Sequence, residues 1–195
     1  MVWITTTELN LEPNRRRAHP VPVPAAGTTV PASEVRDPVS RVRYAIHEHG
    51  DGLVVDTWIE PGGALPPHLH PVQEEVWTVV EGKVHFRLGR GARVIAPEDG
   101  EVRVPAGMVH AVTAVTDREA RLRTVVTPAL RFQPFLEESA AAAREGLFTP
   151  WGMPRGMAGA RFAAQFLKRY RGETVFVRPP RPLQWLLIAL LARGL

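Results

Sequence analysis

The fold is decided by the stretch Gly62-Gly-Ala-Leu-Pro-Pro-His68-Leu-His70-Pro-Val-Gln-Glu74-Glu75-Val-Trp-Thr-Val-Val-Glu-Gly82. On a β-strand, residues two apart point to the same face, so His68 and His70 can converge on one ion. Pro71 then predicts a break in the strand. After that break Glu75 can lie on the next strand and turn back toward the two histidines. This stretch therefore predicts a metal site built on neighbouring strands.

A second stretch, Pro105-Ala-Gly107-Met-Val-His110, predicts a tight turn that leads into a new strand. If the sheet closes into a barrel, His110 can reach the same site from another strand. Three neutral imidazoles and one carboxylate suit a single divalent transition metal, with positions left open for water or substrate. The sequence predicts Fe, Mn, Ni, Cu, Co or Zn and does not distinguish among them.

The regions around these stretches differ in character, and three zones are expected. Residues 1–39 predict a short N-terminal strand and a Pro-rich arm. Residues 40–128 hold many short β-rich runs separated by Gly, Pro and Asp turns, which is typical of an all-β sandwich or barrel. Residues 129–195 predict a helical extension with helices at 135–144, 159–170 and 183–192, the last of them apolar all round.

The pattern Gly62-x5-His68-x-His70-x4-Glu75-x6-Gly82 resembles the first motif of the cupin superfamily, and Pro105-x-Gly107-x2-His110 resembles the core of the second. The resemblance implies a mainly β fold, a double-stranded β-helix (jelly-roll) barrel over residues 40–128. It also assigns the metal ligands, which are His68, His70, Glu75 and His110. Two departures touch no ligand: four residues separate Gly100 from Pro105 instead of five, and Ala114 replaces the closing asparagine.

Other titratable residues compete with this ligand set. Glu74 is the alternative carboxylate, but the spacing to Gly82 belongs to Glu75. The pair His47 and His49 beside a Gly-Asp-Gly turn is interpreted as a decoy, because no carboxylate in a barrel pattern follows it. His85 is expected to face solvent.

The resemblance favours a metalloenzyme, because three histidines and a glutamate are typical of the metal-dependent oxygenases in the family. We expect a dioxygenase-like oxidoreductase acting on a small, partly apolar molecule, with Glu75 as a candidate general base. Strand alternation predicts the walls of the substrate pocket, which are Trp58, Trp77, Val79, Val112 and Ala114. Two alternatives stay open: a non-catalytic, metal-anchored module that binds a small ligand, and an isomerase, cyclase or decarboxylase.

Composition limits the partners and the chemistry. The chain has 195 residues and no cysteine, which excludes a thiol nucleophile, a disulfide framework and Cys-based metal sites. Its net charge is +4, yet residues 129–195 alone carry 10 basic and 4 acidic residues. The basic character therefore belongs to the tail. Nucleic-acid binding is not expected, because no basic stripe interleaved with aromatics appears.

The tail also bears on assembly and location. A basic amphipathic helix followed by an apolar one is typical of a membrane-surface anchor. We favour instead helices buried on the barrel or in a homodimer contact, because short helices that are apolar all round are usually buried. No apolar signal segment stands near Met1, and the longest apolar run, 185–192, is shorter than a membrane span. A cytoplasmic protein is therefore expected.

Overall fold

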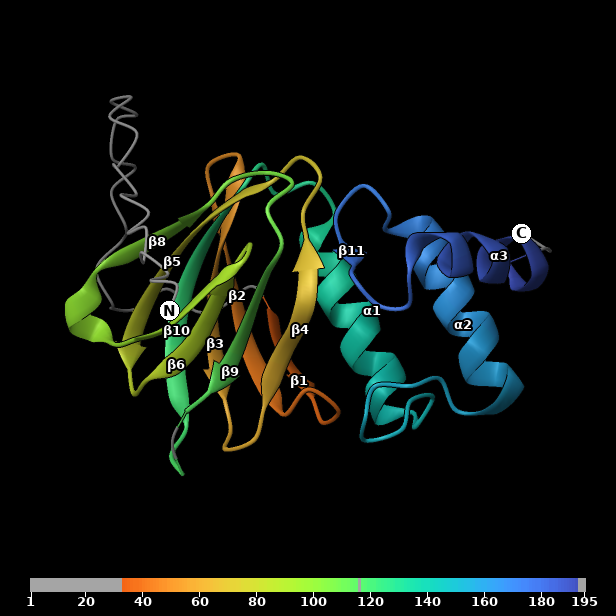
Figure 1. Cartoon of the computed structure of the whole chain (residues 1–195), viewed down its shortest axis with the longest axis horizontal. Helices are drawn as coiled ribbons and strands as arrows, with labels where there is room; N and C mark the ends of the chain where they lie inside the picture. Colours follow the sequence, from red (N-terminus) through yellow and green to blue (C-terminus); the bar gives the residue numbers. More distant parts are fainter. Residues whose placement is uncertain (1–32, 116, 193–195) are drawn as a thin grey trace, which may run out of the picture.

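The computed structural model describes residues 33–115 and 117–192, and two antiparallel β-sheets face each other at its centre (Figure 1). The first sheet has the order β1-β2-β3-β10-β5-β8 and the second β11-β4-β9-β6-β7. The strands are β1 (Ser33–Asp37), β2 (Val42–His49), β3 (Gly52–Ile59), β4 (Ala64–Leu69), β5 (Glu74–Glu81), β6 (Val84–Leu88), β7 (Gly91–Ile95), β8 (Glu101–Val104), β9 (His110–Ala114), β10 (Ala120–Thr127) and β11 (Val175–Phe176). This arrangement confirms the double-stranded β-helix that the sequence predicts.

The space between the sheets is filled by the inward-facing residues of the strands, which alternate with outward-facing ones. Val84, Val112 and Leu122 have no exposed surface, and they come from β6, β9 and β10. Val112 lies opposite Phe86 in the β6–β9 pair. Burial of such β-branched and aromatic side chains is the main force that holds the two sheets together.

Gly82 ends β5 at a place where no other residue fits well. Its φ is +78°, a left-handed conformation that side chains other than glycine rarely adopt. A Cβ atom at this position would also lie 3.1 Å from the Cα of Ala120, on the neighbouring strand β10. The last glycine of the first motif therefore permits a tight turn against β10.

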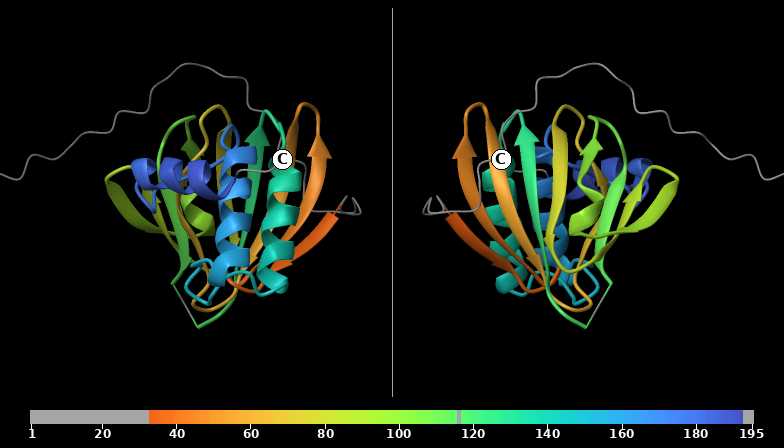
Figure 2. Two further views of the ribbon diagram at one scale, coloured as in Figure 1. Left: turned by 90° about the vertical axis from the view of Figure 1, so that its right-hand side faces the viewer. Right: turned by 90° about the vertical axis from the view of Figure 1, so that its left-hand side faces the viewer.

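Three helices follow the sheets: α1 (Phe132–Arg144), α2 (Gly156–Arg169) and α3 (Arg181–Leu191). The predicted helical extension is confirmed, with each helix beginning two or three residues earlier than expected. Figure 2 shows α1 and α2 side by side along one side of the sheets, with α3 next to α2. Aromatic rings join α1 to α2, since the ring centroid of Phe135 lies 5.2 Å from that of Phe166 and 5.6 Å from that of Tyr170.

Within the single chain the apolar helix α3 is largely exposed, so it is not buried on the barrel, while its burial in a homodimer contact stays a prediction. Gln184 is its one buried residue, while several of its large apolar side chains are exposed. Within the described part of the chain, no helix has both the length and the apolar character needed to cross a membrane.

The predicted arm of residues 1–39 falls almost entirely outside the described residues, and the strand expected near Met1 does so completely. The exception is β1, which pairs with β2 at the edge of the first sheet. At the other end of the chain, β11 pairs with β4 and extends the second sheet. The division at residues 39 and 128 stays a prediction, but elements on both sides of it contribute strands to the sheets.

Candidate metal centre

Three histidines come together between the sheets. His68 on β4 lies opposite His110, the first residue of β9, and His70 follows directly after β4. One ring nitrogen of each histidine lies within 4.8 Å of the corresponding nitrogen of the other two. All three are buried, with His68 the least so at 9% exposed. The structure therefore brings together the three predicted histidines in an arrangement consistent with a metal site.

The other ring nitrogen of each histidine is held by a backbone carbonyl. Nδ1 lies 2.7 Å from the oxygen of Pro66 in His68, 2.6 Å from that of Glu173 in His70 and 3.1 Å from that of Met108 in His110. A carbonyl oxygen can only accept a hydrogen bond, so Nδ1 carries the proton in the neutral rings. Each Nε2 is then left with a lone pair directed away from these carbonyls. Histidines that bind a metal usually donate their other ring N–H to a carbonyl or carboxylate in this way, which fixes the orientation of the ring.

Two of these Nε2 atoms have no hydrogen-bond partner in the described structure. They belong to His70 and His110, which are almost completely buried. A buried polar atom without a partner costs free energy, so such atoms are uncommon unless a ligand satisfies them. The donor set therefore fits a divalent transition metal, which would accept these lone pairs.

Glu75 completes the group from β5. Its two carboxylate oxygens lie 3.2 Å from Nε2 of His70 and 2.9 Å from Nε2 of His110. The indole nitrogen of Trp77 donates a hydrogen bond of 2.9 Å to the same carboxylate. Glu75 is 2% exposed, whereas the competing Glu74 is exposed. The carboxylate that faces the histidines is thus the predicted one.

Burial and neighbouring charge shift the pKa values in this group. Burial opposes the charged form of Glu75, but the contacts of its carboxylate with His110 and His70 outweigh burial and hold the pKa of Glu75 well below its usual range. Burial lowers the pKa of His68 to about 3, helped by His110 and His70. For His70, burial acts downward but the Glu75 carboxylate outweighs it, so the pKa of His70 is raised. A carboxylate and imidazole nitrogens this close require a cation between them, either a proton or a metal ion.

The second motif holds His70 in place through its glycine. The backbone N–H of Gly107 donates a 2.7 Å hydrogen bond to the carbonyl of His70. The N–H of Met108 closes the turn onto Pro105 at 3.1 Å, so Pro105 is the first residue of the turn. Gly107 has a φ of +78°, as the third position of a type II turn requires. The turn that precedes His110 therefore also supports His70.

Sequence reasoning missed the contribution of the C-terminal segment. The carbonyl of Glu173 and the hydroxyl of Thr174 both approach Nδ1 of His70, the latter at 3.3 Å. Both residues are buried, and they directly precede β11, whose Phe176 pairs with His68. No side-chain pattern marks a backbone carbonyl as a partner, so the sequence holds no signal that could have found it.

A cavity of about 90 Å³ adjoins the metal centre through His68 and Glu75. Its walls come from both sheets, from β11 and from α1, which closes the side of the barrel next to β1. Aromatic and aliphatic side chains dominate these walls, with a few hydroxyls among them. The lining residues are Asp37, Ser40, Tyr44, Val55, Thr57, Leu65, Pro66, His68, Glu75, Trp77, Thr124, Phe132, Phe135, Leu136, Ser139, Thr174 and Phe176.

Of the five predicted pocket walls, Trp77 lines this cavity. The other four do not: Val79 and Val112 are core residues further along their strands, and Ala114 ends β9. Trp58 lies on the outer face of the first sheet, where its ring is covered by the guanidinium groups of Arg43 and Arg121 at 3.9 and 5.0 Å from the centroid. The prediction for Trp58 fails because β3 is buried on both faces, so its sequence does not show which face is inward.

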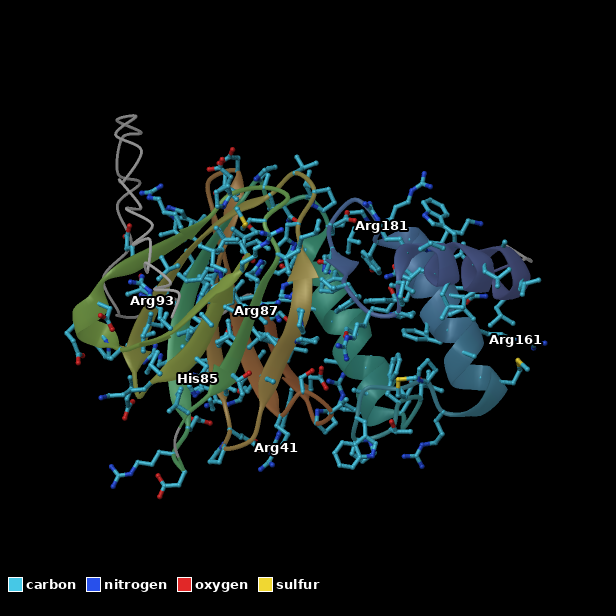
Figure 3. The ribbon with its side chains drawn as sticks, viewed as in Figure 1. Arg41, His85, Arg87, Arg93, Arg161 and Arg181 are labelled. Atoms are coloured by element: carbon cyan, nitrogen blue, oxygen red, sulfur yellow. The ribbon has the colours of Figure 1, made fainter. Side chains whose placement is uncertain are left out.

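The other histidines of the described residues lie away from the centre, as expected, and His19 lies outside the described residues. His47 lies on the outer face of the first sheet, 3.8 Å from the carboxylate of Asp56. His85 is exposed on β6 and points away from the space between the sheets (Figure 3). Within residues 33–115 and 117–192, His68, His70 and His110 form the one group of three or more potential ligands close enough to share a metal ion.

Comparison with known proteins agrees with this arrangement. Residues 56–127 match the family described as "Cupin domain". A 45-residue stretch is 44% identical to the "Probable oxidoreductase patJ" of Penicillium expansum and, equally, to that of Aspergillus clavatus. That stretch is 23% of this chain and spans only 14% of the length of either fungal protein.

Solved structures show similarity of lower degree. An RmlC-like cupin from Shewanella frigidimarina is 20% identical, with a TM-score of 0.46, over 52% of this chain and 89% of its own. The TT1209 protein from Thermus thermophilus is 26% identical, with a TM-score of 0.42, over 46% of this chain and 85% of its own. Residues 56–127 of this chain are thus identified as a cupin domain, and the two sheets and the three facing histidines agree with that match.

Proposed function

We propose that this cupin is a mononuclear metal-dependent enzyme of the oxygenase type, which acts on a small, partly apolar molecule in the cavity beside His68. The observation that carries the proposal is the convergence of three histidine nitrogens, each ring held by a backbone carbonyl at Nδ1, beside a cavity that His68 and Glu75 line. The name "Probable oxidoreductase" of the fungal relatives supports the class of reaction over a short stretch only.

The side chains around the candidate metal centre are the four that the sequence predicts as metal ligands. His68, His70, His110 and Glu75 would hold the metal, and Trp77 would orient the carboxylate through its N–H. When bound, such a metal polarises a carbonyl or enol oxygen or activates dioxygen. Because the pKa of Glu75 is held low, its carboxylate is a weak proton acceptor, and we favour a ligand role over that of general base.

The cavity suggests the size and character of the substrate. One water molecule needs about 10–15 Å³ by the same measure, so 90 Å³ accommodates a compact molecule of a few heavy atoms. Phe132, Phe135 and Leu136 of α1 offer apolar contact on one side. On the other side, the hydroxyl of Thr124 is buried without a hydrogen-bond partner in the described structure, which leaves it free to bind a polar group.

Tyr44 provides a second polar group. Burial, together with the carboxylate of Asp37, raises the pKa of Tyr44 far above its usual range, so the phenol stays protonated at neutral pH. Asp37 itself is engaged, because it accepts hydrogen bonds from the backbone N–H groups of Val39 and Ser40. We infer that the phenol of Tyr44 donates a hydrogen bond to a substrate oxygen. Because this phenol is costly to ionise at pH 7, Tyr44 is excluded as a proton source.

The test combines metal content with oxygen consumption. Elemental analysis of the purified protein should find close to one transition-metal ion per chain, and His68→Ala or His110→Ala should lose it. His85→Gln, on the exposed face of β6, is the matched control and should keep it. The metal-loaded protein should consume oxygen with one or more members of a panel of small enols and phenols, monitored with an oxygen electrode.

Three results would contradict the proposal. If the wild-type and His68→Ala proteins bind metal equally, the histidine centre is not the metal site. If the fully loaded protein binds a panel member saturably but forms no product, the chain is the alternative, a metal-anchored binding module. Product formed without oxygen consumption would point to the isomerase, cyclase or decarboxylase alternative instead.

A further inference from the structure

Helix α3 buries a polar residue and exposes apolar ones, whereas an ordinary surface helix buries its apolar residues and exposes its polar ones. Between residues 182 and 191, Gln184 is the single polar side chain, and it is the buried one. Its amide donates hydrogen bonds of 2.8 and 2.6 Å to the carbonyls of Phe176 and Pro179. The helix is therefore fixed to the body of the protein through its polar residue.

The opposite face of α3 is apolar and exposed. Leu183, Trp185, Leu186 and Leu190 are 44%, 56%, 53% and 59% exposed. Positions 183, 186 and 190 fall at the i, i+3 and i+7 spacing of one helix face, and position 185 flanks it. A large contiguous apolar patch on a protein surface marks a place that something covers.

Exposed cations are frequent in the same C-terminal segment, and acidic residues that would balance them are few. Between residues 146 and 192 the chain has seven basic residues and one acidic residue, Glu173, which is buried. Figure 3 shows Arg161 and Arg181 at the end of the molecule that carries α2 and α3, far from Arg93 on the barrel. Of the seven cations, only Arg169 makes an ion pair with another described residue. The six others, all exposed, are Arg155, Arg161, Lys168, Arg171, Arg178 and Arg181.

We propose that this tail surface, the exposed face of α3 with the six cations named above, binds the surface of an anionic lipid membrane. An apolar helix face that contains a tryptophan and is surrounded by arginine is the combination that enters the headgroup region of a bilayer, with the cations on lipid phosphates. Helix α3 has 11 residues, so it would lie in the interface.

The positive charge also favours a membrane over a second copy of the chain as the occupant of this surface. If two tail surfaces met, their cations would be brought together without acidic residues to neutralise them, and like charges in contact disfavour association. An anionic bilayer offers both an apolar interior for Trp185 and Leu186 and negative charge for Arg178 and Arg181. The membrane surface is therefore the occupant that satisfies both features.

Vesicle flotation of the full-length protein tests this proposal. We expect the protein to float with vesicles that contain phosphatidylglycerol and to remain unbound with pure phosphatidylcholine. The double variant Trp185→Gln/Leu186→Gln should reduce the bound fraction about tenfold, since both changes remove apolar area from the surface. The variant Arg178→Gln/Arg181→Gln should weaken partitioning by about fivefold for each charge removed, and the binding should fall with added salt.

Matched changes on the barrel control for net charge and for loss of fold. Arg87→Gln/Arg93→Gln removes the same charge from β6 and β7 and should bind vesicles like the wild type, and all variants should retain the wild-type circular dichroism spectrum. Equal binding by Arg178→Gln/Arg181→Gln and Arg87→Gln/Arg93→Gln would overturn the proposal. So would a wild-type dimer in light scattering that Trp185→Gln/Leu186→Gln makes monomeric, combined with no vesicle binding.

Discussion

The backbone carbonyl of Glu173 lies 2.6 Å from Nδ1 of His70, although 103 residues separate the two along the chain. This contact fixes the proton of His70 on Nδ1 and leaves Nε2 directed at Glu75. It makes a segment beyond residue 127, where the match to the cupin domain ends, part of the candidate metal centre.

Replacement of Thr174 tests how much this segment contributes. Its hydroxyl also lies against Nδ1 of His70, at 3.3 Å, so Thr174→Val removes a polar neighbour and keeps the shape. We expect metal affinity to fall about tenfold, because groups that orient a ligand typically contribute 10- to 100-fold. Competition with a coloured chelator measures the metal affinity. Thr113→Val, exposed on β9, is the control, and equal affinities in the two variants would contradict a role for Thr174.

Trp77 should stabilise the ionised Glu75. Trp77→Phe removes the indole N–H that donates to the carboxylate at 2.9 Å and keeps an aromatic ring against Phe86. Loss of a hydrogen bond to a buried charged group should lower the free energy of unfolding of the metal-free protein by about 1–3 kcal/mol, measured by urea denaturation.

Trp58→Phe is the matched control for that change, because it keeps a ring beneath Arg43 on the outer face of the sheet. It should cost less than about 1 kcal/mol, since the contact is partly exposed. If both variants lose the same stability, the indole N–H has no special effect on Glu75.

Removal of the Thr124 hydroxyl should not lower the free energy of unfolding, in contrast to the change at Trp77. Its buried hydroxyl has no hydrogen-bond partner in the described structure, so Thr124→Val exchanges an unsatisfied polar atom for a methyl group of similar size. The free energy of unfolding should stay unchanged or rise by up to about 1 kcal/mol. Thr78→Val, on the opposite face of β5 from Trp77, provides the reference. A clear loss of stability in Thr124→Val alone would mean that the hydroxyl is already bonded.

The buried His68 predicts how stability depends on pH. Its pKa is about 3 in the folded protein and about 6.5 when exposed, so the unfolded chain binds more protons between these values. Stability should therefore fall as the pH is lowered from 6.5 toward 3, with a contribution of up to about 1.4 kcal/mol per pH unit from this one group. Urea denaturation of the metal-free protein between pH 6.5 and 5.5 measures this pH dependence where exposed carboxyl groups are still mostly ionised.

His68→Gln should make that dependence shallower, because it removes the titrating group. His85→Gln, on the exposed face of β6, should keep the wild-type slope. Identical slopes in all three proteins would show that His68 takes up a proton equally well in the folded and unfolded chain.

Much of the fold and part of the centre could be predicted because their signals are local. The two motifs place His68, His70 and His110 on strand ends and turns whose spacing is set over a few residues, and the structure brings these three together. Glu75 was distinguished from Glu74 by its spacing to Gly82, and it is the carboxylate that faces the histidines.

The rest depended on packing that a sequence does not display. Strand β3 is buried on both faces, so alternation could not show that Thr57 faces the cavity and Trp58 does not. The carbonyl of Glu173 is a backbone group, which any residue type would supply. Helix α3 was expected to be buried because it is apolar. Its composition shows that it is hydrophobic but does not show which part of the protein or which partner covers it.

The rings around α1 have a consequence for the protein as a whole. The imidazole of His70 lies 5.3 Å from Phe132, which stacks on Phe135 at 5.8 Å, and Phe135 contacts Phe166 of α2. One unbroken line of aromatic contacts thus joins the histidine centre to the helix on which α3 packs. The cavity and the helices α1 and α2 therefore share one set of packed aromatic rings, so we expect a substitution in these rings to affect both the histidine centre and the helix against which α3 packs.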